Sequence, residues 1–130
     1  MYCLDTNIVI DILRGDNNLK VKLEKLSKSN EGLFITPVTL CELYKGAYLH
    51  HNPLQKIQDL EKVISSFIIL DFNEKASKKF GEEYAKLSKN GKLAGEFDLM
   101  IASIAKVHNI ILITRDKKDF DNIDVKIEVW

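Results

Sequence analysis

The chain has 130 residues, of which 45% are hydrophobic and 29% are charged, and its formal net charge is zero. This length fits one domain, residues 1–130, and the composition is ordinary for a soluble globular protein. A general nucleic-acid-coating protein would be basic, so any nucleic-acid function must depend on a local site. No apolar run approaches the ~20 residues of a membrane span. No signal peptide is expected either, because Asp5 and Asp11 flank only Ile8 to Ile10, and the cytoplasm is therefore the expected location.

The hydrophobic pattern predicts strands that alternate with helices, an arrangement typical of a parallel sheet covered by helices on both faces. Strands are expected at residues 2–4, 33–35, 67–70, 110–113 and 125–129. The third is an unbroken apolar run, which indicates a strand buried on both faces, and the last alternates like an edge strand. The chain shows no repeat, linker or second domain.

Helical spacing of apolar residues is present in six segments between these strands. They lie at residues 7–13, 19–28, 37–49, 54–64, 76–87 and from 97 or 98 to 107. Three have a predicted N-cap whose side-chain oxygen can accept an early backbone N–H: Thr6 or Asn7, then Thr36 followed by Pro37, then Asn73.

Side chains other than acids are interpreted more simply. Cys3 and Cys41 have no disulfide or metal spacing, and both are expected to be small buried hydrophobes. His50 and His51 end a helix and are expected to interact with its dipole. The lysines between residues 75 and 92 are interpreted as a solvated helix face, although phosphate binding is an alternative.

Four acids are predicted to lie near the carboxyl ends of the strands, which is where ligands bind to parallel sheets. Asp5 follows the first predicted strand, and Asp116 lies just beyond the fourth. Glu42 lies in the helix after the second strand, and Asp98 lies at the start of the helix before the fourth. We expect them to converge if the first and fourth strands are neighbours.

Several carboxylates in close proximity cannot all remain ionised without a cation. Oxygen ligands of this kind suit Mg²⁺ or Mn²⁺. Such an ion can stabilise charge on a phosphodiester and lower the pKa of a bound water, which is the chemistry of metal-dependent nucleases. Each acid also has a simpler interpretation: Asp98 as a helix cap, Asp116 as a turn residue and Glu42 as a solvated helix position.

Four segments of the sequence resemble, in order, the motifs of PIN-domain proteins, and particularly of VapC-type toxins from toxin–antitoxin pairs. They are Leu4-Asp5-Thr6-Asn7, Thr36 to Leu43 with Gly46, Phe97 to Ala105, and Leu112 to Phe120. Residues 53–90 carry no diagnostic motif. The resemblance implies a three-layer α/β/α PIN-like domain with a central, mostly parallel five-stranded sheet.

The same resemblance implies a metal-dependent endoribonuclease with Asp5, Glu42, Asp98 and Asp116 as its acidic site. Asp5 and Asp98 would bind Mg²⁺, with Mn²⁺ as an alternative, and Glu42 and Asp116 would complete the site or hold metal-bound water. Supporting roles are implied for further residues, with Asp119 preferred as a turn cap over an outer acid and Arg115 left unassigned. The supporting set is Thr6, Asn7, Thr114 and Asp119.

The resemblance further implies three partners and no membrane. RNA would be the substrate, a VapB-type antitoxin would place its carboxyl-terminal segment across the acidic pocket, and a second copy would form a homodimer. Two alternatives remain. One is a receiver-like signalling domain, with Asp71 phosphorylated and Thr114 and Lys126 as switch residues, and the other is a PIN scaffold without catalysis.

Overall fold

The computed structural model describes residues 1–93 and 95–130 and contains a parallel sheet of five strands in the order β3-β2-β1-β4-β5. The strands are short, and their bounds are β1 Tyr2–Leu4, β2 Leu33–Ile35, β3 Ile68–Ile69, β4 Ile111–Thr114 and β5 Ile127–Val129. This arrangement confirms the predicted α/β architecture. It places β1, the strand that ends at the first acid, in the middle of the sheet.

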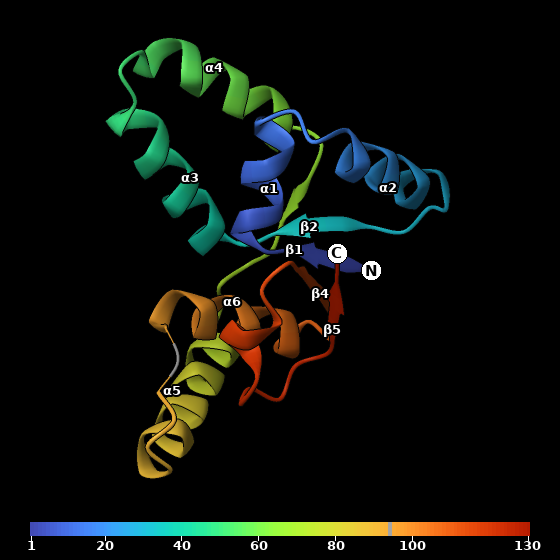
Figure 1. Cartoon of the computed structure of the whole chain (residues 1–130). Helices are drawn as coiled ribbons and strands as arrows, with labels where there is room; N and C mark the ends of the chain where they lie inside the picture. Colours follow the sequence, from blue (N-terminus) through green and yellow to red (C-terminus); the bar gives the residue numbers. More distant parts are fainter. Residues whose placement is uncertain (94) are drawn as a thin grey trace.

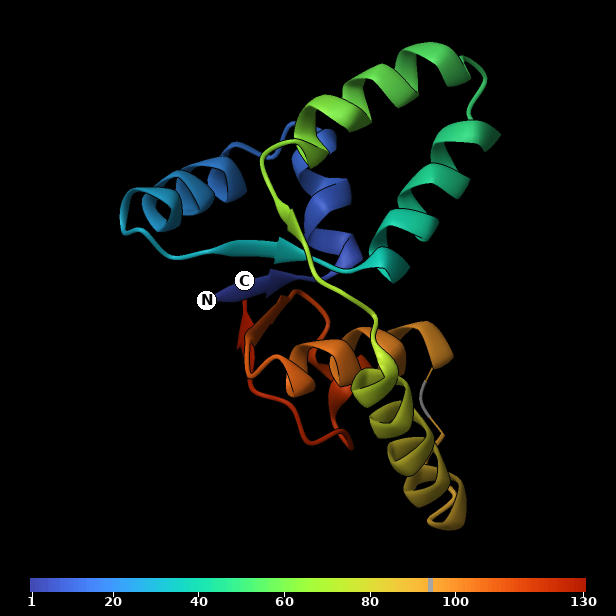
Figure 2. The same ribbon diagram turned by 180° about the vertical axis from the view of Figure 1, so that it is seen from behind.

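Helices cover both faces of this sheet (Figure 1, and from behind in Figure 2). They are α1 Thr6–Leu13, α2 Asn17–Lys28, α3 Pro37–Leu49, α4 Pro53–Ile64, α5 Glu74–Lys89 and α6 Glu96–Val107, with a 3-10 turn, η1, at Lys117–Phe120. The two views place α1 to α4 on one face and α5, α6 and η1 on the other.

Alternating side chains of the central strands enter two separate cores. Cys3 and Leu112 pack with the α5–α6 layer, and Leu4 and Ile113 pack with α1 to α4. Because Leu4 pairs with Ile113 in register, the ends of β1 and β4 lie side by side. The chain leaves β1 toward β2 and later returns to its other side as β4, so this point is a topological switch point, where ligands of such sheets bind.

Two predicted helix starts are confirmed. The Thr36 hydroxyl accepts the Thr39 N–H at 3.1 Å, and Pro37 occupies the first turn of α3, where no N–H is required. The Asn73 carboxamide oxygen accepts the Ala76 N–H at 2.9 Å and caps α5. Each cap satisfies a backbone donor that has no partner inside its helix.

Other sequence expectations were wrong. The first helix is capped by Asp5, and Thr6 is its first helical residue. The β3 strand is an exposed edge, with Ile68 and Ile69 58% and 41% accessible, because it pairs only with β2 and no strand of the sheet lies beyond it. Cys3 is buried as expected, whereas Cys41 is exposed on α3. An apolar run shows that a strand forms, but the packing of neighbouring elements decides whether it is covered.

Across residues 1–93 and 95–130, no helix has the length and apolar character required to cross a membrane.

The cap at Asn73 generates a prediction about stability. Asn73→Ala removes the acceptor for the Ala76 N–H and should lower the free energy of unfolding by about 1 kcal/mol, as measured by urea denaturation. Asn73→Asp retains a side-chain acceptor, so its free energy of unfolding should fall much less. Equal stability of the alanine variant and the parent would contradict the assigned cap.

Candidate acidic site

Asp5 is a buried carboxylate at the centre of the sheet edge, only 2% exposed. Its backbone N–H donates to the Ile113 carbonyl at 2.9 Å, which extends the β1–β4 pairing to the acid itself. One carboxylate oxygen accepts the Thr6 N–H at 2.8 Å, and the other accepts the Thr114 hydroxyl at 2.8 Å. These contacts fix both oxygens of Asp5 relative to the ends of β1 and β4.

Thr114 connects this acid to the loop that follows β4. Its buried hydroxyl donates to Asp5 and accepts the backbone N–H of Asp116 at 3.1 Å. The Thr114 hydroxyl therefore bridges Asp5, at the end of β1, and the backbone of Asp116, in the loop after β4. The Asp116 side chain itself is exposed.

A chain of threonine hydroxyls holds the acid on α3. Thr6 donates to Glu42 Oε1 at 2.9 Å, so the Thr6 oxygen, which lies 3.0 Å from that of Thr39, must accept the Thr39 proton. Thr36 lies 3.4 Å behind Thr39 and can donate to it in turn. An ionised carboxylate accepts hydrogen bonds and donates none. The Glu42 carboxylate therefore sets the order of donation along the chain, from Thr36 to Thr39, from Thr39 to Thr6 and from Thr6 to Glu42.

Asp98 reaches the same edge from the first turn of α6. The helix begins at Glu96 after Gly95, whose missing side chain leaves room for the acid. A Cβ atom at position 95 would lie 3.1 Å from Asp98 Oδ2, so a larger residue there would require the carboxylate to shift by a few tenths of an ångström. Asp98 is therefore a half-buried side chain directed toward the start of its helix, and it is not the helix cap.

Asp119 completes a group of five acids, Asp5, Glu42, Asp98, Asp116 and Asp119, which we call the acidic cluster. Asp119 lies in η1, where its backbone N–H donates to the Asp116 carbonyl. Its carboxylate raises the pKa of both Asp5 and Asp98 by repulsion. Asp116, not Asp119, occupies the N-cap position of η1, and no side-chain hydrogen bond caps this turn. The role of Asp119 as an outer acid stays a prediction.

Burial and mutual repulsion disfavour ionisation across the cluster. Burial, followed by the charges of Asp119, Asp5, Glu42 and Asp116, raises the pKa of Asp98 from 3.8 to about 7. Burial also raises the pKa of Asp5, while the Thr114 and Thr6 hydrogen bonds oppose that rise. The pKa of Asp119 is raised by burial and by the charge of Asp116. No protein cation is among the causes of these pKa shifts, so no neighbouring positive charge offsets the repulsion between the ionised acids.

The donor set fits a hard divalent cation, since it consists of carboxylate oxygens that a positive charge would stabilise. Within the described part of the chain, no three acid, histidine or cysteine side chains are grouped closely enough to hold an ion together. Mg²⁺ commonly uses one or two carboxylates and keeps several waters, so a cage of three protein ligands is not required.

Sequence reasoning left Arg115 unassigned, and the structure shows that it joins two elements. Its Nε lies 3.2 Å from Asp11 on α1, and its Nη2 donates to Asp16 at 2.7 Å. Asp16 also caps α2 through its other oxygen. Arg115 thereby ties the loop after β4, which carries Asp116, to the α1–α2 corner. Only spatial proximity reveals this role, because the partners lie about a hundred positions away.

Two other sequence expectations are not part of this geometry. Asn7 is exposed, and its side chain forms no hydrogen bond with the residues that the structure describes. Asp71 follows the edge strand β3, and β2 separates it from β1, so it does not join Asp5. The phospho-acceptor arrangement of a receiver domain is therefore absent from the described residues.

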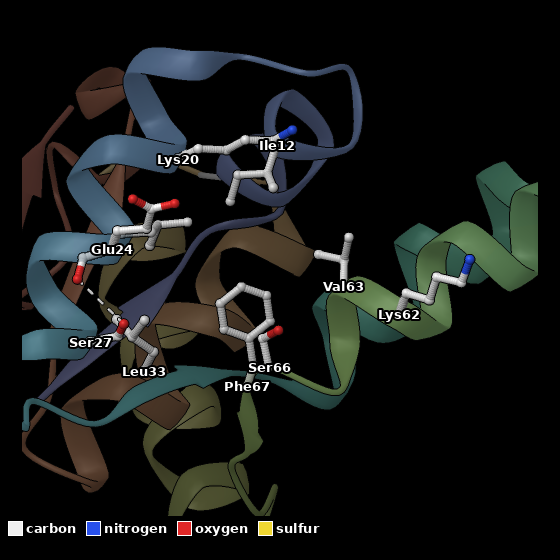
Figure 3. A pocket seen from close by; sticks show the side chains of 10 residues that line it. Ile12, Lys20, Glu24, Ser27, Leu33, Lys62, Val63, Ser66 and Phe67 are labelled. Atoms are coloured by element: carbon white, nitrogen blue, oxygen red, sulfur yellow. Dashed lines mark hydrogen bonds between the residues drawn. The ribbon is translucent and has the colours of Figure 1, made fainter.

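An apolar hollow of about 340 Å³ lies away from the acids, between α2 and the turn from α4 to β3 (Figure 3). Its walls include Ile12, Leu23, Leu33, Val63 and Phe67, and Lys20 and Glu24 lie at its edge. No member of the acidic cluster lines it, so it is not the candidate chemical site.

The sequence matches the model of the PIN domain over residues 2–126, and the chain belongs to this family. Among curated proteins, it is 36% identical to ribonuclease VapC2 of Haemophilus influenzae, over 99% of this chain and 97% of that protein. It is also 30% identical to the tRNA(fMet)-specific endonuclease VapC of Shigella flexneri, with the same coverage. These matches confirm the resemblance that four sequence motifs indicated.

Solved structures agree with this assignment. A chain in the crystal structure of VapBC2 from Rickettsia felis, bound to a promoter DNA fragment, superposes with a TM-score of 0.94 at 31% identity. It covers 99% of this chain and 98% of that chain. VapBC-1 from Haemophilus influenzae gives a TM-score of 0.88 at 34% identity, covering 99% and 97%. The receiver-like alternative is therefore wrong.

The raised pKa of Asp98 predicts the pH dependence of metal-free stability. The folded protein retains this proton up to about pH 7, whereas an unfolded chain loses it near 3.8, so stability should fall as pH rises between these values. Asp98→Asn removes the titrating charge. In EDTA, its melting temperature should exceed that of the parent by more at pH 8 than at pH 5.

Asp59→Asn is the matched control, because Asp59 is exposed on α4 and lies outside the acidic cluster. It should show no such pH-dependent difference. A parent and an Asp98→Asn variant that melt together at pH 8 would contradict the proposed repulsion.

Proposed function

We propose that this chain is a metal-dependent endoribonuclease that acts as the toxin of a VapBC-type toxin–antitoxin pair, with residues 1–130 forming a single PIN domain. The observation that carries the proposal is the acidic cluster at the topological switch point, with the pKa of Asp98 raised to about 7 by burial and neighbouring acids. VapC ribonucleases that align over nearly the whole chain support it. A PIN scaffold without catalysis would have no need to retain this costly group of charges.

The metal would be Mg²⁺, with Mn²⁺ as the alternative, and Asp5 and Asp98 would hold it. When bound, such an ion supplies charge stabilisation at a phosphodiester and lowers the pKa of a coordinated water. Glu42 and Asp116 would complete the site or orient water next to it. Oxygen-only donors favour these ions over zinc or copper, which prefer nitrogen and sulfur ligands.

The surrounding residues keep the acids in position. Thr114 and the Thr6 N–H hold the two Asp5 oxygens, so the carboxylate cannot rotate when charge builds up beside it. The Thr6 hydroxyl holds one oxygen of Glu42 and leaves the other available. Asp116 is exposed, and its carboxylate would accept a hydrogen bond from an attacking water. Such preorganisation lowers the cost of rearrangement during the reaction.

The proposal includes partners and location. Solved VapBC complexes support a VapB-type antitoxin as the partner. We propose that its carboxyl-terminal segment lies across the acidic cluster and inserts a basic residue there. Structured RNA is the substrate class, and the name of the Shigella flexneri relative makes tRNA(fMet) the first RNA to test. We further propose that the toxin is a homodimer and acts in the cytoplasm.

Replacing one central acid tests the catalytic assignment. Asp5→Asn retains an oxygen that can cap α1, but it removes the charge that would hold the metal. With Mg²⁺ present, cleavage of tRNA(fMet) should fall by at least roughly 100-fold, as measured by gel electrophoresis of end-labelled RNA. EDTA should abolish cleavage by the parent, and Mg²⁺ or Mn²⁺ should restore it.

Asp59→Asn serves again as the control, since it makes the same chemical change on α4 and should leave cleavage unaltered. A folded Asp5→Asn variant that cleaves RNA as fast as the parent would overturn the assignment of this site.

A further inference from the structure

A second hollow adjoins the acidic cluster, and we call it the basic hollow. It has a volume of about 360 Å³ and is formed by α1, α3 and α4, which lie together on one side of the sheet (Figure 1). Arg14, His50 and Lys56 line it above an apolar floor that includes Leu43 and Ala47. Arg14 and His50 are the residues that end α1 and α3, and Lys56 lies in α4, so the grouping is visible only in the folded protein.

Glu42 connects the basic hollow to the acidic cluster. This residue lines the basic hollow, and it also lines a more open indentation shared with Phe97 and Asp98. Its Oε1 is held by Thr6 on the side of Asp5. A polymer that crosses Glu42 would therefore pass directly from the proposed metal-binding acids to the cations of the hollow.

The two permanent cations of the hollow are not neutralised by the protein. Over residues 1–93 and 95–130, neither Arg14 nor Lys56 forms an ion pair, whereas Arg115 and Lys106 are both bound to aspartates. Lys56 is also half-buried, and a lysine in such a position can pack its stem on apolar surface while its charge stays in water. Cations kept unpaired at the edge of a hollow are available to an anionic ligand.

His50 adds a hydrogen-bond donor. Its Nδ1 accepts the Asn52 backbone N–H at 3.1 Å, so the proton of the neutral ring resides on Nε2. The ring can therefore donate through Nε2 in both its neutral and its charged form. Together with the guanidinium fork of Arg14, the hollow offers donors of the kind that bind phosphate oxygens.

We propose that the basic hollow binds an RNA backbone phosphate that flanks the scissile one. This inference rests on the proposed ribonuclease function, and it answers a question raised by composition. The chain has no net charge, and its acidic cluster repels RNA, so a local cationic site must offset that repulsion. A neighbouring phosphate held by Arg14, Lys56 and His50 would align the strand across Glu42.

The test measures RNA binding in a cleavage-deficient Asp5→Asn background. The probe is a fluorescein-labelled anticodon stem–loop of tRNA(fMet), titrated in Mg²⁺ at several salt concentrations and followed by fluorescence anisotropy. Arg14→Gln with Lys56→Gln should raise the Kd roughly tenfold, as expected for lost charge-assisted hydrogen bonds. The slope of log Kd against log salt should fall by about 0.7 for each lost phosphate contact.

The matched control pair is Lys25→Gln with Lys28→Gln. These lysines are exposed in the last turn of α2, which leads to the start of β2 and hence to the opposite edge of the sheet. The change in net charge is identical, so a specific site predicts little change in Kd. The charge-preserving pair Arg14→Lys with Lys56→Arg should recover most of the affinity, and thermal melting should confirm that each variant folds.

Chemical neutralisation of the RNA locates the contact. A neutral methylphosphonate is placed at each RNA position in turn. At one position near the cleavage point, it should weaken RNA binding by the protein with the intact hollow and leave binding by the Arg14→Gln, Lys56→Gln variant unchanged. In the catalytically active background, the glutamine pair should raise KM more than it lowers kcat.

Three results would overturn the proposal. They are an unchanged Kd and salt slope for the glutamine pair, an equal loss in the α2 control pair, and a loss of antitoxin binding with RNA binding retained. The last result would make the hollow a protein-docking site. A parent protein that binds the stem–loop through the hollow but cleaves no RNA would refute the proposed function and leave this inference intact.

Discussion

The buried carboxylate of Asp5 is the constraint on which the rest of the site depends. Burying an unpaired charge is costly, so the fold must either satisfy it or keep it protonated. Two short hydrogen bonds, from the Thr6 N–H and the Thr114 hydroxyl, satisfy both oxygens, and each donor belongs to a different strand end. The same contacts therefore stabilise the carboxylate and join β1 to the loop that carries Asp116. Stability and site geometry depend on one set of bonds.

Around this centre, the protein separates opposite charges in space. Five acids share one sheet edge, and burial with mutual repulsion raises the pKa of Asp98 to about 7. Arg115, which follows Thr114 directly, is held by Asp11 and Asp16, while Arg14 and Lys56 line a neighbouring hollow. The zero net charge thus conceals a local separation of acidic and basic groups. Such separation suits a ligand that carries several regularly spaced negative charges and meets a divalent ion at one of them.

Much of the fold could be predicted because its causes are local. Thr36 with Pro37 and Asn73 specify helix starts through a single side chain and the next few N–H groups. Alternating strands and helices specify a parallel sheet. The failures involve neighbours that lie far away along the chain. Ile68 and Ile69 look like a core strand but lie on an edge, and Asp119 looks like a turn cap but lies near enough to Asp98 to raise its pKa, because packing places each of them.

By itself, the sequence determined which residues are acids at strand and helix ends, which segments form which elements, and, through four ordered motifs, the family. Those properties depend on residue type and short spacing. Only the tertiary structure decided that Thr6 donates to Glu42 and pairs with Thr39, that Arg115 binds Asp11 and Asp16, and that Arg14, His50 and Lys56 share a hollow. Each of these requires a distance between residues that are remote in the chain, and the order of strands in the sheet sets that distance.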